Sequence, residues 1–128
     1  MTSSVLIFIV EDEEAIWSLL EDALTDDGFA VAGVVTGEEA MATLNARGAD
    51  FSALVTDINL PGNFSGWDVA KHAREINVTL PVIYVSGASA HDWGSKGVPQ
   101  SKMISKPFAV AQVVTAVSQL INEAAQPT

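Results

Sequence analysis

Residues 5–12 read Val-Leu-Ile-Phe-Ile-Val-Glu-Asp, six apolar residues followed at once by two acids. A short apolar run without polar interruption is typical of a parallel β-strand that is covered on both faces. Four further short apolar runs follow along the chain, and amphipathic stretches separate them. We therefore expect five strands, over Val5–Val10, Ala30–Val35, Phe51–Thr56, Pro81–Val85 and Lys102–Ser105.

The stretches between these runs carry helical signals. An apolar stripe at helical spacing runs from Ala15 to Leu24, and a second one runs from Val110 to Ile121. Thr36 followed by Glu39 predicts a capping box at the start of a helix that ends near Gly48. Another helix is expected after Ser65-Gly66. Residues 89–100 contain Gly94, Gly97 and Pro99, so this segment has room for only a turn or two of helix.

Strands that alternate with helices five times predict an α/β protein, a (βα)5 doubly wound parallel sheet with right-handed crossovers. The expected strand order is 2-1-3-4-5, as in flavodoxin-like folds. The chain has 128 residues, which suits one domain spanning 1–128 with a core at about 4–123.

Composition narrows the possible functions. The chain has no cysteine, which excludes disulfides, thiolate metal sites and cysteine nucleophiles. Its formal net charge is −10. Such an acidic chain is repelled by nucleic acid and by anionic lipid, so neither is an expected partner. No apolar run is long enough to span a membrane or to serve as a signal peptide, and we expect a cytoplasmic protein. Other proteins, small phosphorylated donors or cations are the expected partners.

Polar residues gather where the predicted strands end. The carboxyl ends of parallel strands meet at one edge of the sheet, where ligands bind in such folds. The residues expected there are Glu11, Asp12, Asp57, Asn59, Ser86 and Lys106. Close carboxylates repel one another unless a cation lies among them. Oxygen ligands of this kind suit Mg²⁺ (or Mn²⁺), Asp57 can act as a carboxylate nucleophile, and Lys106 can neutralise a phosphoryl oxygen.

The same residues resemble those of a known family. Glu11-Asp12, then Asp57 with Leu60-Pro61 and Gly66, then Ser86-Gly87-Ala88, and finally Lys106-Pro107-Phe108 are similar to the receiver domain of two-component response regulators. The likeness extends over almost the whole chain.

The resemblance implies a role for each residue. Asp57 would be the phosphoacceptor, taking its phosphoryl group from a histidine kinase, a histidine phosphotransfer protein or a small phosphodonor. Asp12, Asp57 and the backbone carbonyl of Asn59 would hold Mg²⁺, with Glu11 acting through a water molecule. Ser86 and Lys106 would grip the phosphoryl group, and the Lys106–Pro107 peptide bond would be cis. Apart from its own phosphorylation and dephosphorylation, the chain would not be an enzyme.

Two features depart from the family pattern. Ser86 and an aromatic residue three positions before the strand-5 lysine usually form the switch, but that position holds Met103 here. The fourth helix is also short and rich in glycine. We therefore expect the output to depend on residues 89–100, with phosphorylation exposing or covering Trp93.

Other classes of protein remain as alternatives. A flavodoxin-type carrier needs a phosphate loop after strand 1, where this chain has four consecutive acids at 11–14. A haloacid-dehalogenase-type phosphatase needs an acid two residues after its nucleophile, and Asn59 cannot donate a proton. A non-phosphorylated binding module would be expected to have lost Asp57, the acidic pair or Lys106. The chain could also be a receiver excised from a hybrid histidine kinase, although Met1 favours a free-standing regulator.

Overall fold

A five-stranded parallel sheet forms the centre of the computed structural model, which describes residues 5–125. Its strand order is β2-β1-β3-β4-β5, which confirms the predicted fold class and order. The strands are β1 (Leu6–Val10), β2 (Ala30–Val34), β3 (Ala53–Asp57), β4 (Val82–Ser86) and β5 (Ser101–Ser105).

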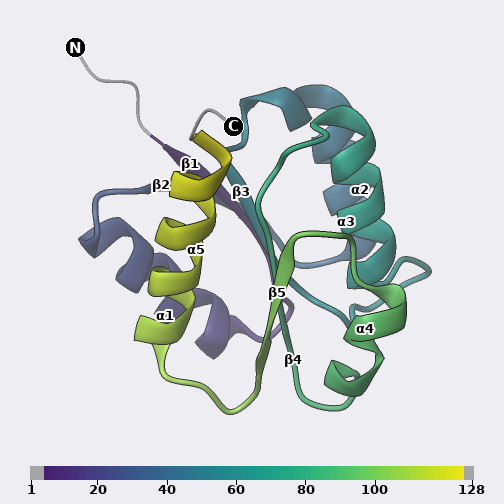
Figure 1. The fold of residues 1–128 in the computed structure, drawn as a ribbon. Coiled ribbons are helices and arrows are strands. Elements are labelled where there is room, and N and C mark those ends of the chain that lie inside the picture. The colour runs from purple at the N-terminus through teal and green to yellow at the C-terminus, as the bar shows by residue number, and fades with distance from the viewer. Residues whose placement is uncertain (1–4, 126–128) are drawn as a thin grey trace.

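Helices cover both faces of the sheet (Figure 1), with α1 and α5 on one side and α2, α3 and α4 on the other. The helices are α1 (Glu14–Asp26), α2 (Gly37–Arg47), α3 (Gly66–Ile76), α4 (Trp93–Lys96) and α5 (Val110–Ala125). Two single 3-10 turns, η1 (Gly48–Asp50) and η2 (Ala90–Asp92), complete the described elements. None of the helices within residues 5–125 is long and apolar enough to cross a membrane.

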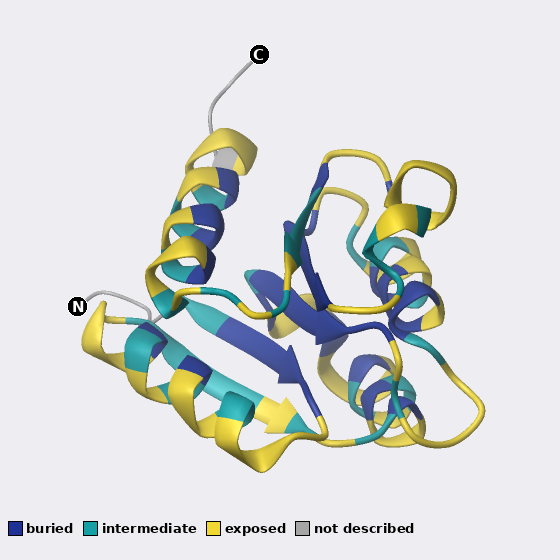
Figure 2. Cartoon of the chain, turned by 90° about the horizontal axis from the view of Figure 1, so that it is seen from below, coloured by how far each residue is buried: buried dark blue, intermediate teal, exposed yellow. Residues whose placement is uncertain are grey.

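Each face of the sheet has its own apolar core. Alternate strand residues point to opposite faces, so Phe8 and Leu54 pack against α2 and α3 while Ile7 and Val55 pack against α1 and α5. All five residues of β3 and of β4 are buried. Figure 2 shows these buried strands between helices whose outer surfaces are exposed. Burial on both faces explains why the strands read as continuous apolar runs.

The predicted strand boundaries are correct to within two residues, and α5 extends four residues beyond the apolar stripe that predicted it. Thr36 and Glu39 form the expected capping box at the start of α2. Ser65 and Asp68 form a second capping box at the start of α3, which the sequence analysis did not identify. Strand β3 begins at Ala53 rather than at Phe51, because Phe51 follows the turn η1 and stacks on Phe8 with ring centroids 4.4 Å apart.

The segment between β4 and β5 contains little helix, as its glycines predict. It contains only the turn η2 and the single turn α4. The Nε1–H of Trp93 donates to the hydroxyl of Ser101 at 2.9 Å, and this hydroxyl donates to the carbonyl of Val98 at 2.6 Å. Trp93 is 39% exposed. Side-chain hydrogen bonds therefore stabilise this segment, which has no longer helix to do so.

Candidate functional site

Asp57 is the last residue of β3 and lies at the carboxyl edge of the sheet. Only 6% of the residue is exposed. Its Oδ1 atom accepts a hydrogen bond from the backbone N–H of Ile58 at 2.6 Å, and its Oδ2 atom accepts one from Lys106 at 3.0 Å. Both carboxylate oxygens thus face donors at the mouth of the site.

Gly66, the first residue of α3, makes close contact with the backbone at Asp57. A Cβ atom at this position would overlap the carbonyl oxygen of Asp57 and would lie 2.8 Å from the Cα atom of Ile58. The N–H of Gly66 also donates to the carbonyl of Ile58 at 2.8 Å. The absence of a side chain at Gly66 therefore lets α3 begin directly against the residue that carries the candidate nucleophile.

Lys106 projects its ammonium group into a set of three carboxylates. The Nζ atom lies 3.0 Å from Asp57, 3.1 Å from Glu11 and 3.4 Å from Glu13. Burial by itself would lower the pKa of Lys106, but the hydrogen bonds and charges of Asp57 and Glu11 outweigh it, and the pKa lies above its ordinary value. Lys106 therefore carries a full positive charge at neutral pH. The Lys106–Pro107 peptide bond is cis, as expected.

Glu11 is wholly buried, which is unusual for a carboxylic acid. Burial, reinforced by the charge of Asp57, raises its pKa to about 7, against the opposing effects of the Glu13 N–H and of Lys106. The Oε2 atom accepts a hydrogen bond from the N–H of Glu13 at 3.0 Å. The Oε1 atom forms an ion pair with the ammonium of Lys106 at 3.1 Å, although no well-angled hydrogen bond reaches it among the described residues. The buried Glu11 carboxyl group is thus held by Lys106 on one oxygen and by the N–H of Glu13 on the other.

Glu11, Asp12 and Asp57 together form a candidate metal centre. One carboxylate oxygen from each residue can be chosen so that all three lie within 4.8 Å of one another. Two of these residues are buried and Asp12 is exposed, so the group opens to solvent on one side. A set of three hard carboxylate donors that opens to solvent fits Mg²⁺, which is commonly held by few carboxylates and several waters.

Ser86 is the last residue of β4 and is wholly buried. Its carbonyl accepts a hydrogen bond from the N–H of Lys106 at 2.9 Å, which fixes the two residues relative to each other. Its hydroxyl lies 3.4 Å from the N–H of Ser89. Strand pairing places Asp57 beside Val85, so Ser86 follows one residue later on the neighbouring strand. The sheet thereby brings the predicted hydroxyl and ammonium to the same edge as the acids.

The sequence predicts that the backbone carbonyl of Asn59 binds Mg²⁺, and this stays a prediction. The described contact of Asn59 involves its side chain. The hydroxyl of Ser89 donates to Oδ1 of Asn59 at 3.2 Å, which joins the loops after β3 and β4. Sequence reasoning missed this contact, because the two residues are separated by 30 positions. Glu13, which was not predicted as a site residue, also contacts Lys106, with Oε1 3.4 Å from Nζ.

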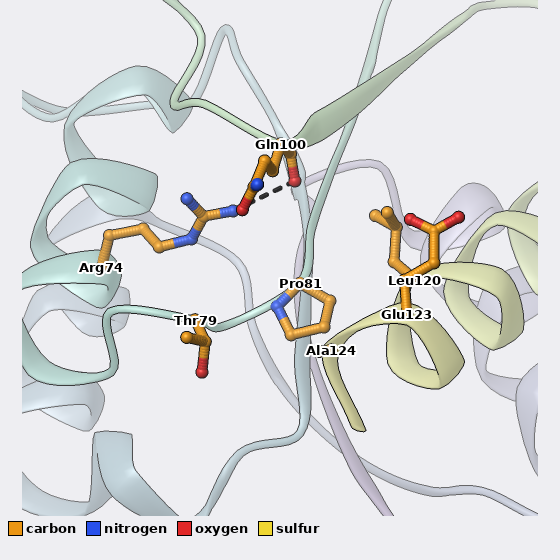
Figure 3. A pocket seen from close by; sticks show the side chains of 7 residues that line it. All are labelled: Arg74, Thr79, Pro81, Gln100, Leu120, Glu123 and Ala124. Carbon is orange, nitrogen blue, oxygen red and sulfur yellow. Dashed lines mark hydrogen bonds between the residues drawn. The ribbon is translucent and has the colours of Figure 1, made fainter. Parts of the chain in front are cut away.

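The described cavity lined by Arg74 belongs to another part of the molecule. It has a volume of about 290 Å³ and is lined by Arg74, Thr79, Pro81, Gln100, Leu120, Glu123 and Ala124. The side chain of Arg74 points toward Gln100 (Figure 3). Its guanidinium donates to the carbonyls of Leu80, Pro99 and Gln100, at 2.6, 2.7 and 3.2 Å. These bonds tie α3 to the segments that lead into β4 and β5, which is a structural role.

The geometry agrees with the comparison against known proteins. Residues 7–118 match the family model of the response regulator receiver domain. The chain therefore belongs to the receiver domains of the response regulators of two-component systems, the CheY-like class that its fold and acidic site define.

Individual relatives support this membership. The crystal structure of a response regulator receiver protein from Sinorhizobium medicae WSM419 is 42% identical, with a TM-score of 0.91 over 95% of this chain and 98% of that one. The receiver domain from the hybrid histidine kinase CckA is 27% identical, with a TM-score of 0.74 over 91% of this chain and 98% of that one. The transcriptional regulatory protein QseB from Haemophilus influenzae is 32% identical over 118 residues, which are 91% of this chain and 52% of that protein. The chain spans about half or less of the length of the first curated relatives it matches.

Proposed function

We propose that Asp57 accepts a phosphoryl group in a reaction that requires Mg²⁺ (or Mn²⁺), and that this modification switches a protein–protein interaction. One observation carries the proposal. The ammonium of Lys106 lies 3.0 Å from Oδ2 of Asp57 and 3.1 Å from Oε1 of the buried Glu11 carboxyl group. A positive charge is thus held where a transferred phosphoryl group would need one.

In the proposed step a carboxylate oxygen of Asp57 attacks phosphorus and forms an acyl phosphate. The bond between phosphorus and the donor nitrogen or oxygen breaks, and its electron pair leaves with the donor, which takes up a proton where its basicity requires. Phosphoryl transfer depends mainly on positioning and on charge stabilisation. Lys106 would neutralise one phosphoryl oxygen, and the hydroxyl of Ser86 would donate to another.

The acidic side chains define where a cation would be held. Asp12 and Asp57 would supply carboxylate oxygens, Asn59 its backbone carbonyl, and Glu11 a carboxylate that acts through water. A bound Mg²⁺ would offset the charge of these groups and polarise the phosphoryl oxygens. Without a cation, Glu11 is protonated over part of the accessible pH range because its pKa is about 7.

Histidine kinases, histidine phosphotransfer proteins and small phosphodonors such as acetyl phosphate are the proposed sources of the phosphoryl group. The downstream partner is proposed to be a protein, and the cytoplasm is the proposed location. The proposed chemistry is limited to the phosphorylation and dephosphorylation of Asp57 itself, without turnover of other substrates. The alternative is a receiver-like binding module that is never phosphorylated.

The test compares wild-type protein with Asp57→Asn, incubated with acetyl phosphate in Mg²⁺ or in EDTA. Intact mass spectrometry should detect one phosphoryl group on the wild type in Mg²⁺ only, and none on Asp57→Asn. Labelling that persists in the variant or in EDTA would contradict the proposal. A folded wild-type protein that takes no label from acetyl phosphate or from a panel of histidine kinases would favour the binding module.

A further inference from the structure

A groove lies beside α1 on the side that faces β2, and Asp12 of the acidic site is part of its lining. Its volume is about 640 Å³. The residues that line it are Asp12, Glu14, Trp17, Ser18, Val35 and Pro61. Three of these side chains are large and apolar, two are acidic, and no lysine, arginine or histidine is among them.

Trp17 forms a fixed aromatic wall of this groove. Its indole lies directly over Gly33 of β2, where an added Cβ atom would overlap the ring and would lie 2.7 Å from Nε1. Trp17 also packs at the edge of the core formed by α1 and α5. The indole is thus held in place by the sheet beneath it while part of the side chain remains accessible. A preorganised aromatic surface loses little conformational freedom when it binds a partner.

The opposite wall is also anchored. Val35 is 47% exposed, and its backbone N–H lies 3.3 Å from Oε1 of Glu39. The N–H of Asn63, two residues after Pro61, donates to Oε2 of Glu38 at 2.9 Å. These contacts fix the loops after β2 and β3, and they place two further carboxylates close to the groove. An exposed valine in an ordered wall is a feature that a binding partner could cover.

The groove and helix α1 are both acidic. Helix α1 carries Glu14, Glu21, Asp22 and Asp26 and has no basic residue. An indole beside carboxylates is complementary to a guanidinium group, which stacks on the ring and pairs with the acids. We propose that this groove binds an arginine side chain, with an adjacent apolar residue, presented by a partner protein. This proposal does not depend on the phosphorylation of Asp57.

The probe for the test is a blocked tripeptide, acetyl-Ala-Arg-Leu-amide, titrated into ¹⁵N-labelled full-length chain in EDTA. Heteronuclear NMR should show saturable shifts of the Trp17 indole N–H and of the Gly33 amide. The dissociation constant of such a short peptide should be on the order of a millimolar, the weak end of specific binding. The same peptide with citrulline in place of arginine keeps the shape without the charge, and should bind at least fivefold more weakly.

Three variants separate the contributions. Glu14→Gln keeps the shape of the groove and should weaken arginine binding severalfold, while Trp17→Ala should abolish the saturable shift at Gly33. Trp93→Phe, far along the chain, is the matched control and should leave binding unchanged. Asp57→Asn should bind like the wild type, so a failure here is distinct from a failure of the phosphorylation proposal.

Several outcomes would overturn the inference. Equal shifts with arginine and citrulline would show an apolar groove without selectivity for charge. Absence of shifts at Trp17 and Gly33 up to about 10 mM peptide, well above the expected millimolar constant, would show that the groove does not bind arginine. Shifts that depend on protein concentration without peptide would indicate that a second copy of the chain occupies the groove.

Discussion

Tyr84 and Met103 lie opposite each other on the neighbouring strands β4 and β5. Tyr84 is wholly buried, and its hydroxyl accepts a hydrogen bond from the backbone N–H of Val98 at 3.1 Å. Its ring packs against Trp67 with centroids 4.8 Å apart. Met103 is only partly buried at the edge of the same core. The aromatic side chain of this strand pair is therefore that of Tyr84 on β4, and the facing position on β5 holds Met103.

Replacing Tyr84 with phenylalanine should destabilise the protein. The N–H of Val98 is buried and would lose its acceptor, which typically costs about 1–3 kcal/mol. Urea unfolding followed by circular dichroism would measure the loss. The substitution removes only a hydroxyl group from the core, so the secondary structure and the far-ultraviolet spectrum of the folded variant should stay the same. A stability equal to that of the wild type would mean that water replaces the lost acceptor.

Met103 is not expected to act as the switch. Methionine is flexible and adapts to gaps, so it marks two states less sharply than an aromatic ring does. In Met103→Ala, a beryllofluoride mimic of phosphorylation should still change amide exchange in residues 89–100. Fluorescence of Trp93, whose Nε1–H donates to Ser101, should change as well. Abolition of these responses in the variant would instead assign the switch to Met103.

Lys106→Ala should fold in Mg²⁺ and respond poorly to beryllofluoride. Two charges 4 Å apart interact by about 4 kcal/mol at an effective dielectric constant of 20, and partial exposure reduces this value. We expect the beryllofluoride concentration needed for half response to rise tenfold or more. Lys102→Ala, on β5 but outside the site, is the matched control. An unchanged response in Lys106→Ala would remove this residue from the site.

Stability in EDTA should fall as the pH rises from about 4.5 to about 7. The pKa of Glu11 is raised from 4.5 to about 7 by burial, so the folded protein retains a proton that the unfolded chain releases. This contribution is complete below pH 4.5 and is lost as the pH rises through 7. Its upper limit is roughly 3 kcal/mol.

Urea midpoints of wild type and Glu11→Gln between pH 4.5 and 8 would measure this effect. The difference between the two curves isolates Glu11, because all other titrating groups are common to both. Added Mg²⁺ should restore stability to the wild type at the upper end of the range. Parallel curves in EDTA would show that the proton is not retained by Glu11.

Gly66→Ala should impair phosphorylation and stability together. The new methyl group would overlap the carbonyl oxygen of Asp57, so either α3 or the candidate nucleophile must move. We expect a loss of about 1–3 kcal/mol, typical of overpacking. Gly94→Ala is the matched control, because a Cβ there meets nothing within 4 Å. Wild-type labelling of Gly66→Ala by acetyl phosphate would show that the site tolerates the shift.

The sequence by itself determined the fold and the composition of the site. Five apolar runs of strand length, separated by helical patterns, allow few arrangements besides a doubly wound parallel sheet. Because the carboxyl ends of such strands meet, the sequence alone assigns Asp57, Ser86 and Lys106 to one edge of the sheet. The capping box of Thr36 and Glu39 was equally accessible, since its residues are only three positions apart.

Only the tertiary structure decided which of these groups touch. Glu13 is one acid among several at a helix start, and nothing local distinguishes the one that reaches Lys106, 93 positions away. The bond between Ser89 and Asn59, the overlap of Trp17 with Gly33 and the burial of Glu11 likewise depend on how separate elements pack. Periodicity and capping are short-range and are written in adjacent residues. Side-chain contacts and the pKa of Glu11 depend instead on distances and desolvation, which exist only after the sheet and helices have assembled.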